Sequence, residues 1–115
     1  MSKRFDKPLL IDIVEAAEDV LEWTKDMTFD QYVRNELTRD ATMHKLQAIG
    51  SAASKVSDKL KLAAPNIAWS EIIETCHRST LDLNEVSDET IFRIVHEQLL
   101  PMKDQLTTVL EAGVE

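Results

Sequence analysis

Cysteine, histidine and arginine follow one another at Cys76, His77 and Arg78, and all three side chains can take part in catalysis. A thiolate acts as a nucleophile when a positioned base removes its proton, and an arginine can stabilise a developing negative charge. Neighbouring side chains on a helix point about 100° apart, so Cys76 and His77 would not face each other. The pattern therefore favours a small, partly buried thiol over a catalytic pair.

A second pattern, Glu74 followed three residues later by His77, places a carboxylate and an imidazole on one helix face. A helical bundle that binds two metal ions needs two such motifs and two further carboxylates. The chain has no second Glu-x-x-His, because neither His44 nor His96 has a matching partner three residues away. We therefore predict neither a metal site nor a cofactor.

Length and composition predict a single domain over residues 1–115. Two Gly, three Pro and 43% hydrophobic residues favour packed helices. One cysteine excludes an internal disulfide and suits a reducing compartment, and no secretory leader or long apolar run is present, so we expect a cytoplasmic protein. A net charge of −8 argues against broad nucleic-acid binding, yet it is compatible with a small basic patch.

Apolar residues at three- and four-residue spacing predict an all-α, up-and-down bundle of four long helices and one short helix. The helices are expected over residues 8–24, 29–37, 40–62, 69–80 and from residue 88 to near the C-terminus. About six N-terminal and four C-terminal residues are expected to fray. The predicted buried seam of the third helix is Leu46, Ile49, Ala53, Val56 and Leu60.

Local signals predict where the helices begin and bend. Pro8 suits a first helical turn, Thr28 with Gln31 forms a capping-box pattern, and Asp88 is a candidate N-cap. Pro101 falls within a continuing apolar pattern and predicts a kink rather than an end.

The two tryptophans, Trp23 and Trp69, are expected to be structural. Trp69 should pack beneath the loop that precedes its helix, with a hydrogen-bond partner for the indole N–H.

Six segments, in this order and spacing, resemble the HepT-like proteins of the HEPN class, and the resemblance spans residues 9–110. The segments are 10–17, 27–32, 46–53, 69–73, 86–88 and 98–102, which include Trp-x-Glu-Ile-Ile at residues 69–73 and a Leu-Pro step at residues 100–101. The resemblance implies a HEPN-like helical fold, a homodimer, and a minimal nucleotidyltransferase as partner in a prokaryotic toxin–antitoxin pair.

Members of that family cut RNA without metal through an Arg-x4-His-x-Tyr motif at the dimer interface. Histidine can transfer protons near neutral pH, arginine can stabilise the charge at phosphorus, and the partner can attach a nucleotide to the tyrosine. The arginine, histidine and tyrosine slots hold Cys76, Leu81 and Leu83 here. The resemblance implies that six residues of this segment lie at the dimer or partner interface: Cys76, His77, Arg78, Leu81, Asp82 and Leu83.

The altered motif implies a HepT-like protein that keeps the fold, the dimer and the partner but has lost RNA cleavage. Leucine cannot transfer a proton or accept a nucleotide, and cysteine supplies no fixed positive charge. An active ribonuclease that uses His77 and Arg78 in a shifted site is the alternative, although catalysis tolerates only small misplacement. An unrelated helical adaptor is a second alternative. The acidic net charge makes RNA a weaker predicted partner, and no membrane is expected.

Overall fold

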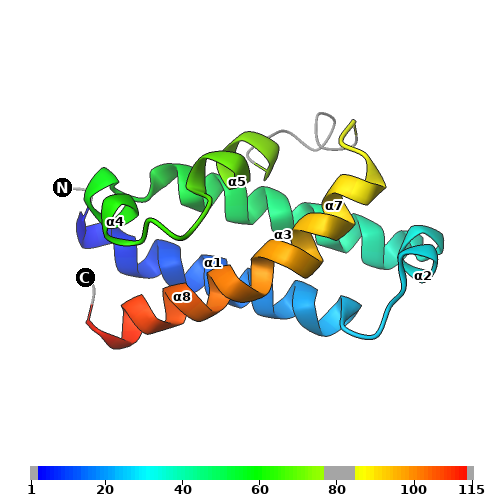
Figure 1. The fold of residues 1–115 in the computed structure, drawn as a ribbon, viewed down its shortest axis with the longest axis horizontal. Helices are drawn as coiled ribbons and strands as arrows, with labels where there is room; N and C mark the ends of the chain where they lie inside the picture. The colour runs from blue at the N-terminus through cyan, green and yellow to red at the C-terminus, as the bar shows by residue number, and fades with distance from the viewer. Residues whose placement is uncertain (1–2, 77–84, 114–115) are drawn as a thin grey trace.

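The computed structural model describes residues 3–76 and 85–113, and all regular elements in these ranges are helical. They are α1 (Lys3–Thr24), α2 (Phe29–Arg34), α3 (Glu36–Lys55), α4 (Asp58–Ala63), α5 (Trp69–Cys76), α7 (Asp88–Ile94), the π-helical turn η1 (Val95–Leu99) and α8 (Leu100–Glu111). Figure 1 shows α1 and α3 as a long antiparallel pair. α1 also packs on α8, and α3 packs on α5. The predicted all-α bundle is confirmed.

The core lies between α1, α3 and the α7–η1–α8 segment. Its fully buried members include Leu10, Ile13, Val20, Leu46, Ile49, Leu99 and Leu106. Each such side chain contributes about 1.5–3 kcal/mol on leaving water. All five residues of the predicted seam are buried, although Val56 lies at the C-cap of α3 and Leu60 lies in α4. No helix in the described part of the chain is long and apolar enough to cross a membrane.

The predicted start of the first helix at Pro8 is wrong, because α1 begins at Lys3 and contains Pro8. A contact distant in sequence accompanies the earlier start. The Asp6 side chain is 2% exposed. Its Oδ1 accepts a hydrogen bond from the Ser57 backbone N–H at 3.0 Å, and its Oδ2 accepts one from the Ser57 hydroxyl at 2.6 Å. This Asp6–Ser57 contact fastens the first turns of α1 to the α3–α4 corner, which local spacing does not reveal.

The predicted continuous helix over residues 40–62 is also wrong. α3 ends at Lys55, Val56 is extended with ψ 142°, and α4 begins at Asp58. Ser57 is the N-cap of α4, and its Oγ accepts a hydrogen bond from the Leu60 backbone N–H at 3.2 Å. A serine side chain competes with the helical backbone for such hydrogen bonds, so it favours a new helix start over continuation.

The boundary between the second and third helices lies earlier than predicted. α2 ends at Arg34, and Asn35 caps α3 by accepting a hydrogen bond from the Thr38 backbone N–H at 3.0 Å. The capping box of Thr28 and Gln31 at the start of α2 is confirmed.

The last helix is capped by Ser87 rather than by Asp88, because the Ser87 Oγ accepts a hydrogen bond from the Thr90 backbone N–H at 3.1 Å. The distortion predicted at Pro101 takes the form of the π-helical turn that precedes it. A proline removes an N–H and crowds the preceding turn, and a widened turn accommodates both effects while the apolar face continues.

The two tryptophans differ. Trp69 is 7% exposed, and its indole N–H donates to the Ala64 carbonyl at 3.1 Å, as predicted. Trp23, expected to be structural, is 39% exposed and lies at the surface.

Candidate functional site

The segment assigned to the altered motif begins at the end of α5. Contacts hold α5 in place along its length. Trp69 is held through its backbone N–H, which donates to the Ile67 carbonyl at 2.9 Å, and through its indole. Trp69, Ile72 and Cys76 are buried at helical spacing, and α5 packs against α3. Packing against α3 therefore holds the described part of α5, including Cys76.

Cys76 occupies the position that the resemblance assigns to the catalytic arginine, and it is 1% exposed within the core. A buried thiol packs there as a small side chain, which agrees with the structural interpretation of this cysteine. A guanidinium at the same position would have to leave water or displace its neighbours. Its predicted role at an interface remains a prediction.

The other predicted site residues, His77, Arg78, Leu81, Asp82 and Leu83, lie outside the residues that the structure describes. The predicted end of the fourth helix at residue 80 and the first residue of the predicted turn over 84–87 lie outside them too.

On the far side of that segment, polar contacts hold the start of α7. The Ser87 hydroxyl donates to Thr90 Oγ1 at 2.9 Å as well as capping the helix. The Arg39 guanidinium lies 3.8 Å from the Asp88 carboxylate and donates to the Val33 carbonyl at 2.8 Å. Helix α7 is thus tied to α2 and α3, so both described flanks of the motif segment are anchored.

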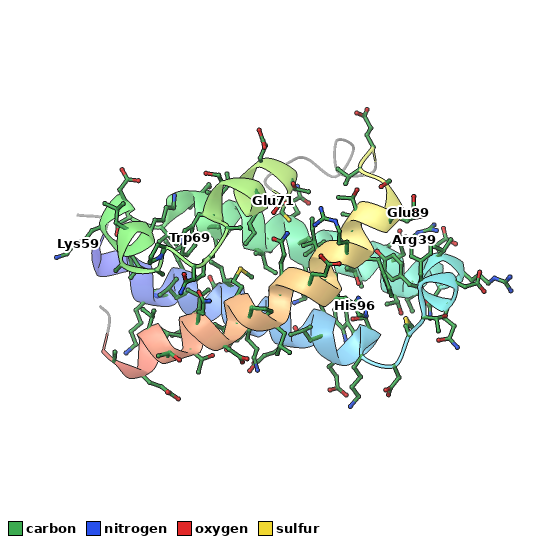
Figure 2. The ribbon with its side chains drawn as sticks, in the orientation of Figure 1. Arg39, Lys59, Trp69, Glu71, Glu89 and His96 are labelled. Carbon is green, nitrogen blue, oxygen red and sulfur yellow. The ribbon has the colours of Figure 1, made fainter. Side chains whose placement is uncertain are left out.

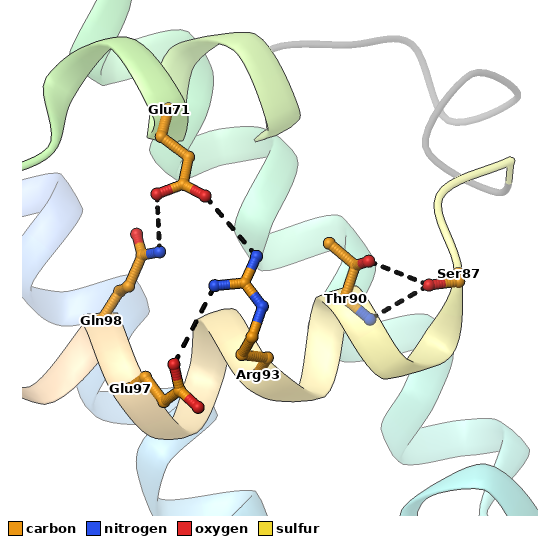
Figure 3. A network of polar contacts seen from close by, with 6 residues as sticks. All are labelled: Glu71, Ser87, Thr90, Arg93, Glu97 and Gln98. Carbon is orange, nitrogen blue, oxygen red and sulfur yellow. Dashed lines mark hydrogen bonds and ion pairs between the residues drawn. The ribbon is translucent and has the colours of Figure 1, made fainter.

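A polar network joins α5 to α7 and η1, and we call it the α5–α7 junction: Glu71, Arg93, Glu97 and Gln98. The Glu71 carboxylate accepts a hydrogen bond from the Gln98 side-chain amide at 2.8 Å and lies 3.5 Å from the Arg93 guanidinium. Arg93 also lies 3.9 Å from Glu97 (Figure 3). The sequence offers only the four-residue spacing of Arg93 and Glu97 as a signal, so the contacts of Glu71 were missed.

The single tyrosine of the chain, Tyr32, is fully buried and packs on Phe92 with ring centroids 5.4 Å apart. Its hydroxyl has no hydrogen-bond partner among the described residues. Burial raises the pKa of the Tyr32 phenol, the Asp88 carboxylate raises it further, and the Arg39 guanidinium lowers it. An enclosed hydroxyl is not accessible to a modifying partner, so Tyr32 does not substitute for the tyrosine slot that the resemblance assigns to Leu83.

The part of the chain that the structure describes contains no group of three or more His, Cys, Asp or Glu side chains that could hold a metal ion. His96 is engaged locally: its Nδ1 lies 3.1 Å from the Phe92 carbonyl oxygen, and its ring lies 4.0 Å from the Phe92 ring.

Known proteins resemble this chain over much of its length. A protein of Methanocaldococcus jannaschii that carries the provisional name of an RNase is 37% identical over 73 residues, which are 64% of this chain and 67% of that protein. A second provisional RNase of the same organism is 30% identical over 69 residues, covering 60% of this chain and 57% of the relative. A Thermococcus cleftensis protein provisionally named ribonuclease HepT is 33% identical over 70 residues, covering 61% and 64%. The matches thus span about two thirds or less of each relative.

The family model described as ribonuclease HepT-like matches residues 13–109. No solved structure matches the chain. The family match runs from α1 to α8 and overturns the alternative of an unrelated helical adaptor. This chain, an all-helical bundle that matches the family model over most of its length, belongs to the HepT-like ribonuclease family.

Proposed function

We propose that this protein is a HepT-like member of a prokaryotic toxin–antitoxin-type system that keeps fold, dimer and partner binding but has lost metal-independent RNA cleavage. The observation that supports the loss is the burial of Cys76 in the arginine slot. The packing there is built around a small side chain. Catalysis by charge stabilisation needs a cation placed beforehand at the phosphate, and a buried thiol offers none.

Incubation of the purified protein with transfer RNA and messenger RNA, without added metal, tests the loss of cleavage. We expect the RNA to stay intact while a ribonuclease of known activity degrades it under the same conditions. Cleavage that disappears in both His77→Ala and Arg78→Ala would overturn the proposal.

An active ribonuclease that uses His77 and Arg78 is the second candidate, and the RNase names of the relatives favour it. Induced expression in bacteria discriminates between the two. The first proposal predicts normal growth, whereas an active toxin would arrest growth and both alanine variants would relieve the arrest.

The dimer and the partner form the binding part of the proposal. The resemblance assigns Cys76, His77, Arg78, Leu81, Asp82 and Leu83 to the dimer or partner interface. Cys76 is already buried within the protomer, so the apolar gain on association rests on Leu81. Apolar burial favours association at about 25 cal/mol per Å², before ordering costs. We expect a dimer by light scattering and co-purification with a minimal nucleotidyltransferase encoded next to it. A monomer at micromolar concentration would contradict the dimer.

A further inference from the structure

Six cations of the described side chains are neutralised by carboxylates. They are Lys25, Arg34, Arg39, Lys45, Arg93 and Lys103, with nitrogen–oxygen distances of 3.1 to 3.8 Å. A paired cation has little attraction left for an external anion. These residues therefore add little to binding of a polyanion.

Four lysines differ, and we call them the basic end: Lys7 of α1, Lys55 of α3, and Lys59 and Lys61 of α4. No carboxylate among the described residues lies within ion-pair distance of any of them. Lys7, Lys55 and Lys59 are exposed and Lys61 is partly exposed. Figure 2 shows Lys59 pointing outward from the end of the bundle. Their charge is therefore available to a ligand.

Tertiary structure assembles the basic end from segments about fifty residues apart. The Asp6–Ser57 contact holds the first turns of α1 against the α3–α4 corner. Residues 3–7 and 55–61 contain six of the 13 lysines and arginines of the chain but only two of its 21 acidic residues. One of these two, Asp6, is buried and occupied by Ser57, which leaves Asp58 as the exposed acid. In a chain of net charge −8, the described lysines of these two segments thus outnumber the exposed acids within them, while Asp12 and Glu15 line one surface pocket with Lys55.

We propose that the basic end binds the phosphate backbone of RNA. The inference goes beyond the proposed function, which keeps fold, dimer and partner binding but assigns no RNA-binding surface; the RNase names of the relatives suggest RNA as the polyanion. Lysine ammonium groups are point charges on flexible stems, so they fit repeated phosphates rather than base edges. A lipid surface fits less well, because the six-residue α4 offers Leu62 as its one large exposed apolar side chain.

Such binding should be strongly salt-dependent and independent of base sequence. Each neutralised phosphate of a single strand contributes roughly −0.7 to the slope of log affinity against log salt. Four contacts then predict that raising salt from about 50 to 200 mM weakens binding roughly 50-fold. Without Lys59 and Lys61, the same increase should weaken it only about 7-fold.

The test is fluorescence polarisation of the full chain with a labelled single-stranded RNA whose 2′-hydroxyls are all methylated. Methylation removes the nucleophile for metal-independent cleavage, so binding can be measured whether or not the protein is a ribonuclease. We compare wild type with Lys59→Gln/Lys61→Gln. The matched control is Lys25→Gln/Arg34→Gln, which removes the same charge from two exposed, paired cations. Lys25 directly follows α1 and Arg34 ends α2, at the end of the bundle opposite α4 (Figure 1).

The proposal expects the 50-fold salt effect in wild type and in the control, and the 7-fold effect in the α4 variant. Equal loss in both variants would assign binding to overall charge and overturn the inference. Absence of RNA binding, or preference for phosphatidylserine vesicles over RNA, would overturn it as well. Cleavage of unmodified RNA in a parallel assay would sink the proposed loss of activity while leaving RNA binding at the basic end standing.

Discussion

The basic end and the α5–α7 junction both carry cations on the surface but use them differently. At the junction, Arg93 lies between the carboxylates of Glu71 and Glu97 and helps to hold two helices together. At the basic end, Lys7, Lys55 and Lys59 are exposed and face no carboxylate among the described residues. A paired cation contributes to the fold, whereas an unpaired cation contributes to the field that a ligand meets. The contrast separates a structural role from a binding role.

A cation placed in the core, at the end of the helix that carries Glu71 of the junction, should have the largest effect. Cys76→Arg restores the family's residue type, but it puts a charge where 1% of the side chain is exposed. We expect a loss of about 3–5 kcal/mol in the free energy of unfolding, measured by urea denaturation, because an unpaired buried charge is costly. Cys76→Ala, the control, should cost about 1 kcal/mol. If Cys76→Arg were as stable as wild type and cleaved RNA, position 76 would accommodate an arginine, which would contradict this prediction.

Removing the contact that assembles the basic end should come next. Asp6→Ala leaves the Ser57 backbone N–H and hydroxyl without their carboxylate, at a cost of about 3 kcal/mol in unfolding free energy. RNA binding by the folded variant should weaken too, since the two lysine-bearing segments separate. Asp12→Ala removes an exposed carboxylate from the same helix and should change stability by less than about 0.5 kcal/mol. Equal effects of the two substitutions would contradict the role of Asp6.

Tyr32→Phe should stabilise the protein by about 1 kcal/mol, because it removes a buried hydroxyl that lacks a partner among the described residues. The raised pKa of Tyr32 has a further consequence. The folded state keeps this proton while the unfolded chain releases it above a pH of about 10, so wild type loses stability as pH rises past that point. Thermal melts from neutral to alkaline pH should show a smaller loss in Tyr32→Phe. A destabilised variant would reveal a partner for the hydroxyl.

The smallest effects compare the two regions directly. Arg93→Gln should lower the free energy of unfolding by about 0.5–1 kcal/mol, since its ion pairs are partly exposed, and should leave RNA affinity unchanged. Lys59→Gln should leave the free energy of unfolding unchanged and weaken RNA binding at low salt. If both substitutions changed the same property, the distinction between the two regions would fail.

Much of the fold could be predicted because its signals are local. Leu46, Ile49 and Ala53 are spaced for one helix face, and that face is buried. The Thr28–Gln31 capping box is a pattern of neighbouring residues, and it forms as expected. The break at Ser57 was missed because the apolar spacing continues across it through Val56 and Leu60, and the contact with Asp6 that accompanies the break is 51 residues away.

The candidate site was predictable only in part. The family resemblance assigned Cys76 to the position of the motif arginine. Whether that position faces solvent or the core depends on how α5 packs against α3. The Glu71 contacts to Arg93 and Gln98 had no sequence signal, since these residues lie more than twenty positions apart. Periodicity reports which face of a helix is apolar, not which polar groups meet across two helices.

Residue types and their spacing were enough to predict a helical bundle and the HepT-like resemblance, and both are confirmed; the replacement of three motif residues stays a prediction. These properties depend on each residue and its near neighbours, which share a helix turn or a cap. Folding decided two further properties, the burial of Cys76 and the gathering of Lys7, Lys55, Lys59 and Lys61 at one end. Burial and electrostatic fields depend on distances in space, and only tertiary contacts set these for residues far apart in the chain.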